Sequence, residues 1–348
     1  MKQIISTLEL KEIDIKKLEP FIERWKQIKD LPCDNIEFHE TDKNTILVKL
    51  YYPLDIFDRS VSQFVTVLFG ELSFVKNFGK VKFLELQLPN EVYKWFTGPK
   101  FGTEEIKKRF DVSNYPLLMA IIKPSLGKTL TTEILETKIK SVLSGGFNAV
   151  KDDEMQGNLN YAPLKHRIKL AKKYQKYIPA INLDKAEDFR KVVSDEKIGA
   201  VLINASTLGF PLLHEIKKIS KVPIISHPAL QGVYGYSFSH KVFAMLHRLF
   251  GCDGYICPIA DVDYFNVSKQ EEKEIIMEFT KDLPIKKTMP LLAGGARINS
   301  LKNIMAPYEK MRIPYGLVFG YQIFADDKKS SQMCKNVVEK VRRIKQNL

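Results

Sequence analysis

The pattern of hydrophobic and polar positions changes near residue 115 of the chain. Beyond that point, short and mostly apolar runs alternate with longer segments of helical period. The eight runs cover residues 117–123, 147–152, 178–184, 199–205, 222–227, 253–257, 289–295 and 315–320. Runs that are apolar throughout are typical of parallel strands covered on both faces, and eight strand–helix units predict a TIM (β/α)8 barrel. We expect the barrel to span residues 115–348 and to end with a helix at 337–347.

An open, doubly wound sheet is the alternative fold for a chain in which strands and helices alternate. Such a sheet would not usually need eight strands, and no G-x-G-x-x-G motif follows the first apolar run. We therefore predict the barrel, preceded by a helical connector at residues 101–114.

The first hundred residues show a mixture of patterns instead of a regular alternation. Residues 18–29 and 58–74 have the apolar spacing of amphipathic helices, whereas residues 44–53 and 81–89 have the composition and alternation of strands. This mixture predicts a smaller α+β domain over residues 1–100, of the ferredoxin-like kind, that acts as a cap.

The composition narrows the class of protein. Hydrophobic residues make up 45% of the 348 positions, which is enough for a packed core. The net charge of +13 raises nucleic acid as a partner, but the basic residues are mixed with acidic ones in helix-like segments, without a nucleic-acid-binding motif. We expect no nucleic-acid partner, and instead a lysine-rich surface that attracts anionic substrates.

Several features of the sequence predict a cytoplasmic protein. The N-terminal residues contain no apolar segment followed by a cleavage site, so a signal peptide is not expected. The apolar run at residues 116–122 is too short to span a bilayer, so we expect no membrane contact. The four cysteines are scattered and form no C-x-x-C pair, which argues against a disulfide framework and against a zinc site.

Charged residues gather where the second predicted strand ends, and the active sites of TIM barrels lie at this end of the strands. The strand ends in Lys151, Asp152, Asp153 and Glu154. Because side chains alternate along a strand, Lys151 and Asp153 share a face while Asp152 points away, and a loop can turn Glu154 back toward Asp153. Two converging carboxylates suit a hard divalent ion such as Mg²⁺. The alternative is a Lys151–Asp153 ion pair with Glu154 in solvent.

Other strand ends supply candidates for substrate binding. Gly294 and Gly295 end the seventh predicted strand and Gly320 ends the eighth, and backbone amides in these two loops are a common phosphate site of TIM barrels. The alternative is that these glycines only turn the chain. Asn204 ends the fourth strand and is a further candidate for binding substrate. His227 ends the fifth and would orient a substrate hydroxyl, a hydrogen-bonded structural histidine being the alternative.

Six motifs carry a family resemblance. They are GGFNAVKDDE (145–154), IIKPSLG (121–127), YPLDIF (52–57), SVSQFVTVLFGE (60–71), HRLFGCD (247–253) and LLAGGA (291–296). Together they resemble the large-chain superfamily of ribulose-bisphosphate carboxylase (RuBisCO), over roughly residues 45–325. The KDDE that follows a glycine pair, combined with the upstream IKP, is a specific signal, and the resemblance implies the same barrel fold.

The resemblance implies a magnesium centre that promotes enolisation. Lys151 would be carbamylated by CO₂, and this carbamate would hold Mg²⁺ together with Asp153 and Glu154. Lys123, in the IKP motif, would transfer protons at the enediolate. Glu71 stands where the methionine-salvage enolases of the superfamily have a lysine base. The N-terminal domain would cap the barrel of a partner chain, so we expect a homodimer or a higher even oligomer.

The departures from the carboxylases decide between branches of the superfamily. Ser125 replaces a second lysine after the IKP motif, and Pro228 replaces an arginine that binds a second phosphate. Asp263 lies near the position of the lysine that places CO₂, and the glycines of the strand-8 loop are reduced to Gly320. These losses argue against carboxylation and indicate a RuBisCO-like protein, the branch that keeps the metal and the enolate chemistry.

We therefore expect a Mg²⁺-dependent enolase or isomerase of a phosphorylated ketose or oxo compound. Lys123, Glu71 and His227 are its candidate catalytic residues. A decarboxylase of a phosphorylated 3-oxo acid would pass through the same enolate and stays open. A non-catalytic binding or regulatory barrel is a second alternative, which the reduced strand-8 loop favours and the intact Lys123 and KDDE set opposes.

Overall fold

The computed structural model describes most of the chain. The residues it describes are 2–13, 18, 20, 22–24, 32–42, 45–114, 116–260, 262 and 264–347, without the side chains of residues 40 and 42. Among them, no helix combines the length and the apolar character needed to cross a bilayer.

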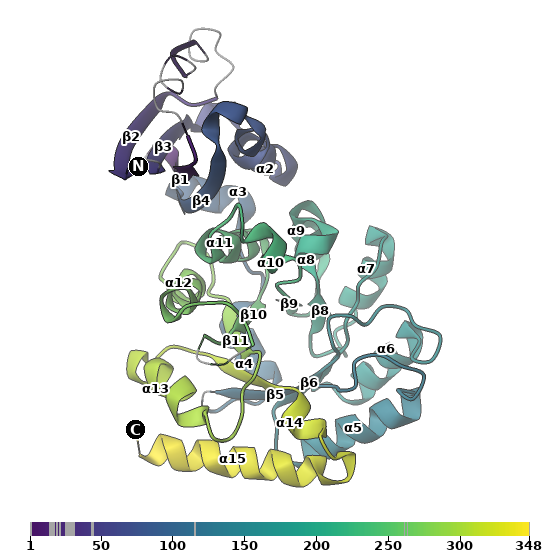
Figure 1. Cartoon of the computed structure of the whole chain (residues 1–348). Coiled ribbons are helices and arrows are strands. Elements are labelled where there is room, and N and C mark those ends of the chain that lie inside the picture. Colours follow the sequence, from purple (N-terminus) through teal and green to yellow (C-terminus); the bar gives the residue numbers. More distant parts are fainter. Residues whose placement is uncertain are drawn as a thin grey trace.

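The N-terminal part forms a four-stranded antiparallel sheet with the order β2-β3-β1-β4 (Figure 1). Its strands are β1 (Gln3–Lys11), β2 (Asn35–Asp42), β3 (Thr45–Pro53) and β4 (Lys80–Gln87). Every second residue of β1 and β3 is buried, since one face of the sheet covers the core of this domain. Helix α2 (Val61–Phe69) follows β3, and Ser60 caps it by accepting a hydrogen bond from the N–H of Gln63.

The predicted α+β domain is thus confirmed, with two strands that the sequence analysis missed. Strands β1 and β2 were not predicted, although β1 alternates strictly between buried and partly buried positions. The predicted helix at residues 18–29 lies mostly outside the described residues.

The second part of the chain is the predicted barrel. Its strands are β5 (Leu117–Ile121), β6 (Ala149–Lys151), β7 (Tyr177–Ile178), β8 (Val201–Ile203), β9 (Ile224–Ser226), β10 (Gly254–Pro258), β11 (Met289–Ala293) and β12 (Gly316–Phe319). They form one eight-stranded sheet in the order β7-β6-β5-β12-β11-β10-β9-β8, and neighbouring strands are parallel. A parallel bridge between Ala180 and Leu202 brings the two ends of the sheet together. All eight predicted strands are present.

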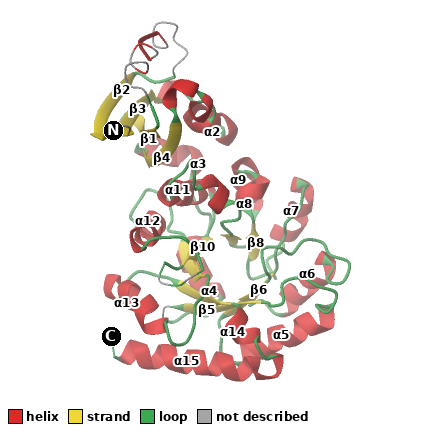
Figure 2. Cartoon of the chain, viewed as in Figure 1, coloured by secondary structure: helices red, strands yellow, loops and turns green. Residues whose placement is uncertain are grey.

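Helices enclose the barrel on its outer side (Figure 2). One long helix follows each strand: α5 (Thr132–Ser144), α6 (Leu164–Lys173), α7 (Ala186–Val193), α9 (Phe210–Ile219), α11 (His240–Phe250), α12 (Lys269–Thr280), α13 (Leu301–Met311) and α15 (Ser330–Gln346). Three short helices lie in the loops at the carboxyl ends of the strands: α8 (Ala205–Leu208), α10 (Gln231–Tyr234) and α14 (Tyr321–Phe324). These short helices were not predicted.

The N-terminal domain rests on α11 and α9 of the barrel (Figure 1). The backbone N–H of Phe83 in β4 donates to the carbonyl of Ser237 at 2.8 Å, and the carbonyl of Phe83 accepts from the N–H of Ser239 at 2.8 Å. The ring of Phe64 meets the ring of Phe250 edge-on, with 6.2 Å between centroids. These contacts hold β4 beside the loop that leaves the fifth barrel strand.

The connector closes the opposite end of the barrel. Helix α3 (Asn90–Phe96) leads to α4 (Gly102–Arg109), which contacts β10 and β11. The buried carboxylate of Asp253 accepts hydrogen bonds from the N–H groups of Phe101 and Gly102, both at 2.7 Å. The predicted boundaries at residues 100 and 114 fall around this connector and stay a prediction.

A buried histidine on α11 leads to a prediction about stability. Both ring nitrogens of His247 face serine hydroxyls, with Ser226 at 3.0 Å and Ser206 at 3.3 Å. Burial lowers the pKa of His247 to about 3 from an ordinary value of 6.5. As the pH is lowered, the unfolded chain therefore binds a proton at His247 before the folded chain does. This difference does not reduce the free energy of unfolding above pH 6.5, but it reduces it progressively as the pH falls toward 3.

We expect the free energy of unfolding to fall between pH 7 and pH 5, by about 2 kcal/mol through His247 alone. Urea unfolding at both pH values measures this loss. In His247→Gln the loss should be smaller by about that amount, because the variant has no group that titrates there. Equal losses in the variant and the unchanged protein would contradict the assignment.

Candidate active site

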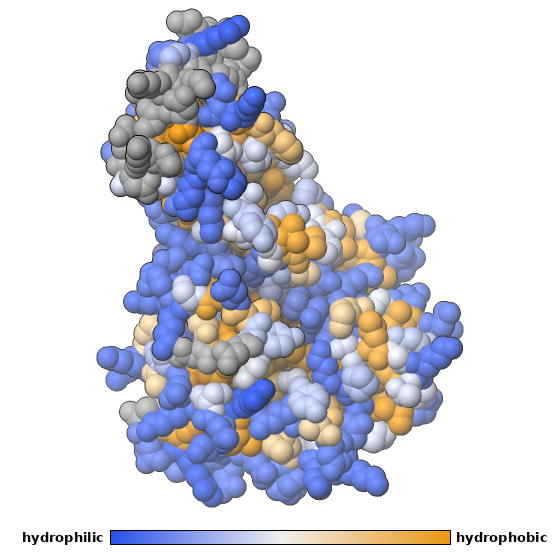
Figure 3. Space-filling view, in the orientation of Figure 1, coloured by the Kyte–Doolittle hydropathy of each residue, from blue (hydrophilic) through white to orange (hydrophobic). Residues whose placement is uncertain are grey.

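A large cavity opens at the carboxyl ends of the barrel strands. Its volume is about 1160 Å³, and it is lined by residues from the loops after β5, β6 and β9–β12 and by Lys82 of β4. Figure 3 shows apolar side chains gathered on the barrel below the N-terminal domain, within a mostly hydrophilic surface. Of the predicted site residues, seven contribute to the cavity or to its floor: Lys123, Asp153, Glu154, His227, Gly294, Gly295 and Gly320.

The strand end that carries KDDE is fixed by Asp152, which points away from the cavity as predicted. Arg167 on α6 donates to the Asp152 carboxylate at 2.5 Å, and both side chains are buried. The hydroxyl of Tyr177 donates to the same carboxylate at 2.6 Å, and the N–H of Ala180 donates at 3.0 Å. Asp152 is thus a structural group that anchors the end of β6, while its neighbours Lys151 and Asp153 face the other way.

Lys151 is completely buried beneath the cavity. Its Nζ donates to the carbonyl of Asp152 at 2.9 Å and lies 3.6 Å from Oε2 of Glu154. Burial lowers the pKa of Lys151, and this effect outweighs the opposing charges of the nearby carboxylates. A buried amine with a lowered pKa is neutral more often than an exposed lysine, and a neutral amine is the form that reacts with electrophiles.

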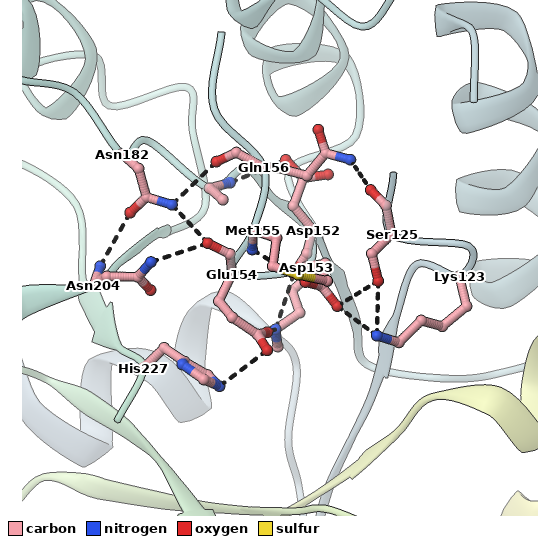
Figure 4. A network of polar contacts seen from close by, with 12 residues as sticks. Lys123, Ser125, Asp152, Asp153, Glu154, Met155, Gln156, Asn182, Asn204 and His227 are labelled. Atoms are coloured by element: carbon pink, nitrogen blue, oxygen red, sulfur yellow. Dashed lines mark hydrogen bonds and ion pairs between the residues drawn. The ribbon is translucent and has the colours of Figure 1, made fainter. Parts of the chain in front are cut away.

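Asp153 is paired with Lys123, which follows the end of the neighbouring strand β5. Nζ of Lys123 donates to Oδ2 of Asp153 at 2.5 Å and to the hydroxyl of Ser125 at 2.7 Å. The Ser125 hydroxyl in turn donates to Oδ2 at 2.7 Å (Figure 4). Burial would raise the pKa of Asp153, but the hydrogen bonds from Lys123, Ser125 and the N–H of Met155 hold it below its usual value. Asp153 is therefore ionised, with Lys123 beside it at the cavity wall.

Glu154 lines the cavity, where its carboxylate meets His227 and Lys151, and not Asp153 as expected. Its Oε1 lies 3.4 Å from Nε2 of His227, and its Oε2 faces Lys151. Burial lowers the pKa of His227 to about 4, so the ring is neutral at pH 7. The side-chain amides of Asn182 and Asn204 donate to the carbonyl of Glu154 at 2.8 and 3.0 Å (Figure 4). These contacts differ from the alternative arrangement, in which Lys151 pairs with Asp153 and Glu154 lies in solvent.

Comparison with curated proteins finds relatives that are named as enolases. A 2,3-diketo-5-methylthiopentyl-1-phosphate enolase of Bacillus cytotoxicus is 30% identical over 275 residues, which are 72% of this chain and 64% of that protein. The chain thus matches less than two thirds of the length of this relative. No family model matches the chain.

Solved structures share the fold of the chain. A RuBisCO-like protein (MtnW) of Alicyclobacillus acidocaldarius has a TM-score of 0.81 at 21% identity, and the match covers 99% of this chain and 95% of that one. The chain belongs to the RuBisCO-like proteins. The dimeric archaeal RuBisCO of Hyperthermus butylicus matches with a TM-score of 0.85 at 19% identity, covering 100% of this chain and 91% of the other. At these identities the structures show the shared fold, a TIM barrel behind a small N-terminal sheet.

A carbamate on Lys151 would complete the site of this RuBisCO-like protein for a metal ion. Among the described residues, no group of three or more His, Cys, Asp or Glu side chains is arranged to hold a metal. Asp153 and Glu154 supply two carboxylates, so a third anionic oxygen would have to come from a carbamate on Lys151. Two buried polar atoms of residues that contact Glu154, Oδ1 of Asn204 and Nδ1 of His227, also have no hydrogen-bond partner within the described part of the chain. Orphaned buried acceptors of this kind indicate a place for a ligand, an ion or water.

The glycines of the RuBisCO-like protein divide into two kinds. Gly294 and Gly295 have φ angles of +94° and +97°, in the region that favours glycine. A Cβ on Gly294 would lie 2.0 Å from the ring of Phe265, and one on Gly295 would lie 3.1 Å from Val262. These two glycines therefore let the loop after β10 pack on them. A Cβ on Gly320 would meet only Lys123, at 3.7 Å. Phosphate binding by the three glycines stays a prediction.

Two of the predicted site residues, Glu71 and Asn204, are not among the described residues that line the cavity of this single chain. Glu71 is exposed at the end of α2, in the N-terminal domain, and is not among the described residues that line the cavity. Its predicted role across a dimer stays a prediction. Asn204 holds the backbone of Glu154 and also does not belong to the described cavity lining, so its contact with the substrate would need Oδ1 to turn outward. Asp263 lies outside the described residues.

The sequence analysis missed several residues that build the site. Ser125 was noted only as the loss of a lysine, yet its hydroxyl joins Lys123 to Asp153. Its place two residues after Lys123 was a usable signal, because it keeps the hydroxyl close to the lysine along the chain. Arg167 gave no such signal, because its partner Asp152 lies 15 residues away in the sequence.

Proposed function

We propose that this RuBisCO-like protein is a Mg²⁺-dependent enolase or isomerase of a phosphorylated ketose or related oxo compound. One observation carries the proposal: a Lys123–Asp153 pair stands beside a pair of the fully buried Lys151 with Glu154, at the ends of β5 and β6. A barrel that served only as a scaffold would have no need for a buried lysine at this end. The names of the curated relatives support an enolase.

Lys151 as a carbamate, Asp153 and Glu154 would hold the ion. When bound, Mg²⁺ would polarise a substrate carbonyl and make the neighbouring proton more acidic. Binding the ion would separate Asp153 from Lys123, which now share a hydrogen bond of 2.5 Å. The side chain of Lys123 would then face the substrate, where its neutral amine can take the proton from the enolising carbon and the ammonium that results can return one. Ser125 would keep Lys123 close to this position.

His227 would orient the substrate. Its Nε2 is engaged by Glu154, whereas Nδ1 is buried without a partner. A neutral ring with a free Nδ1 can accept a hydrogen bond from a substrate hydroxyl. The amides at Gly294, Gly295 and Gly320 would hold a phosphate, as loops in this position commonly do. Pro228 stands where a carboxylase has the arginine for a second phosphate, so we expect substrates with one.

Glu71 and the oligomer belong to the same proposal. Because Glu71 is exposed on the N-terminal domain, it would reach a substrate only in the barrel of a partner chain. One of the similar structures is a dimeric RuBisCO, which supports a dimer as the smallest assembly. We place the protein in the cytoplasm, where the buried thiols of Cys252, Cys257 and Cys334 would stay reduced.

Solvent exchange tests the reaction. The protein is incubated in D₂O with Mg²⁺, bicarbonate and a panel of phosphorylated ketoses and 3-oxo acids, and NMR follows deuterium uptake. We expect deuterium at the carbon beside the carbonyl of at least one phosphorylated ketose. Release of CO₂ from a 3-oxo acid without exchange on any ketose would favour the decarboxylase instead. Neither reaction on any member of the panel would favour a non-catalytic barrel.

Ser125 gives a prediction about the rate of this exchange. Ser125→Ala removes one hydrogen bond from Asp153 and one from Lys123, so we expect turnover to fall about tenfold with KM within about twofold. Ser125→Thr keeps the hydroxyl and should retain most of the activity. Equal losses in the Ala and Thr variants would show that the packing of residue 125 matters, and not its hydroxyl.

A further inference from the structure

A second polar cluster lines the cavity opposite the pairs described above. It consists of Lys82 on β4, Gln231 on α10, His240 at the start of α11 and Glu271 in the first turn of α12. Helices α11 and α12 follow the fifth and sixth barrel strands, β9 and β10. In the closed sheet these strands lie four places from β5 and β6, which is the opposite side of an eight-stranded barrel. A ligand that filled the cavity would reach both sides.

The cluster is held in one orientation from behind. The hydroxyl of Tyr255 donates to Oε1 of Gln231 at 3.2 Å, which directs the Gln231 amide nitrogen at Nδ1 of His240. Because that nitrogen can only donate, Nδ1 of His240 accepts, and the ring proton is on Nε2. Burial lowers the pKa of His240 and outweighs the opposing charge of Glu271, so the ring is neutral. His240 therefore presents an N–H toward Glu271.

Glu271 is fixed in the same way. The N–H and the hydroxyl of Ser268 donate to its Oε2 at 2.9 and 2.8 Å, as part of the capping box of α12. This leaves Oε1 facing Nε2 of His240 at 3.8 Å. That separation is too long for a direct hydrogen bond, so the N–H of His240 and the Oε1 of Glu271 are each open to a third group.

Only some ligand groups satisfy both atoms. A group between them must accept from Nε2–H and donate to a carboxylate, and a hydroxyl does both. One hydroxyl oxygen at about 2.8 Å from each atom fits a gap of this size. A phosphate or carboxylate would be repelled by Glu271, and an ammonium would meet the N–H of His240. A methylthio group would leave both polar atoms desolvated without a partner.

We propose that Gln231, His240 and Glu271 form a binding site for a hydroxyl group at the end of the substrate remote from its phosphate. Lys82, the cation on this wall of the cavity, limits the charge repulsion that Glu271 would exert on an anionic substrate. The inference rests on the proposed function for the phosphorylated-ketose class of the substrate. It departs from the curated relatives, whose names specify a methylthiopentyl compound.

A matched pair of compounds tests the inference. Ribulose 1-phosphate and 5-deoxyribulose 1-phosphate differ by a single hydroxyl at the remote end. Calorimetry measures their binding to the full chain with Mg²⁺ and bicarbonate present. We expect ribulose 1-phosphate to bind at least tenfold more tightly, because a site built to hydrogen-bond a hydroxyl rejects an analogue that lacks it. In His240→Phe and in Glu271→Gln this ratio should fall to within about twofold.

Lys80→Met is the matched control. Lys80 lies two residues from Lys82 on β4 and pairs with Glu12 away from the cavity, so the variant should keep the ratio of the unchanged protein. Glu271→Gln preserves the capping box, which keeps one variant informative if His240→Phe does not fold. A ratio near one in the unchanged protein, or the same ratio in both site variants, would overturn the inference. The intact ratio without deuterium exchange on either compound would leave the hydroxyl site standing and remove the proposed function.

Discussion

Replacing Lys151 by methionine is expected to abolish both tight Mg²⁺ binding and solvent exchange on the substrate. Methionine fills a similar volume, so the fold should survive, but it offers no nitrogen for a carbamate. Of the three proposed ligands only the carboxylates of Asp153 and Glu154 would then remain, and Asp153 would stay paired with Lys123. Without the metal, the substrate carbonyl would not be polarised, and the transition state would lose several kcal/mol of stabilisation. This loss corresponds to a fall in rate of about 1000-fold or more.

Calorimetric titration with Mg²⁺ in the presence of bicarbonate measures the first effect, and deuterium uptake measures the second. Lys138→Met is the matched control, since Lys138 is also a buried lysine but pairs with Asp327 on the outside of the barrel. The control should bind Mg²⁺ and exchange protons at the unchanged rate. Full Mg²⁺-dependent exchange in Lys151→Met would remove Lys151 from the mechanism.

The largest effect on stability is expected at Arg167. Arg167→Met leaves the buried Asp152 carboxylate without its cation, and such a loss typically costs about 3–5 kcal/mol. The hydrogen bonds from Tyr177 and Ala180 would remain, but neither carries a charge. Because Asp152 anchors the end of β6, we also expect the Lys151 and Asp153 side chains to lose their fixed positions. Urea unfolding at pH 7 measures the change in the free energy of unfolding.

Lys172→Met on the same helix supplies the comparison. Lys172 pairs with Asp195 at 2.6 Å, but both side chains are partly exposed. Pairs of this kind contribute at most about 1 kcal/mol, so Lys172→Met should change the free energy of unfolding far less than Arg167→Met does. Similar losses in the two variants would mean that the Asp152–Arg167 pair does not hold the strand end.

The barrel was predictable from the sequence because its strands are covered on both faces. Runs such as 289–295 are apolar throughout, and this pattern does not depend on partners elsewhere in the chain. Strand β1 was harder to recognise, although its residues alternate, because its outward positions carry polar side chains that also occur in exposed loops. Strand β7 has only two residues, so its position was recognisable mainly from the regular spacing of the other strands along the sequence.

The candidate site was predictable only in part, for a different reason. The alternation of side chains was enough to separate Asp152 from Lys151 and Asp153. It could not show that Asp153 pairs with Lys123 instead of Lys151, because that choice depends on how β5 and β6 align. The polar cluster around His240 gave no signal either. Its members come from four separate elements, and Lys82 joins the other three only where the N-terminal domain docks on α11.

The central claim is that Lys151, Asp153 and Glu154 form a CO₂-dependent magnesium centre that drives enolisation. The most direct test is deuterium uptake by a phosphorylated ketose in D₂O, measured by NMR on protein stripped of metal and of CO₂, and again after each is returned. We predict that uptake appears only when Mg²⁺ and bicarbonate are both present. Uptake at the full rate in the stripped protein would contradict the claim, as would uptake that Mg²⁺ restores without any bicarbonate.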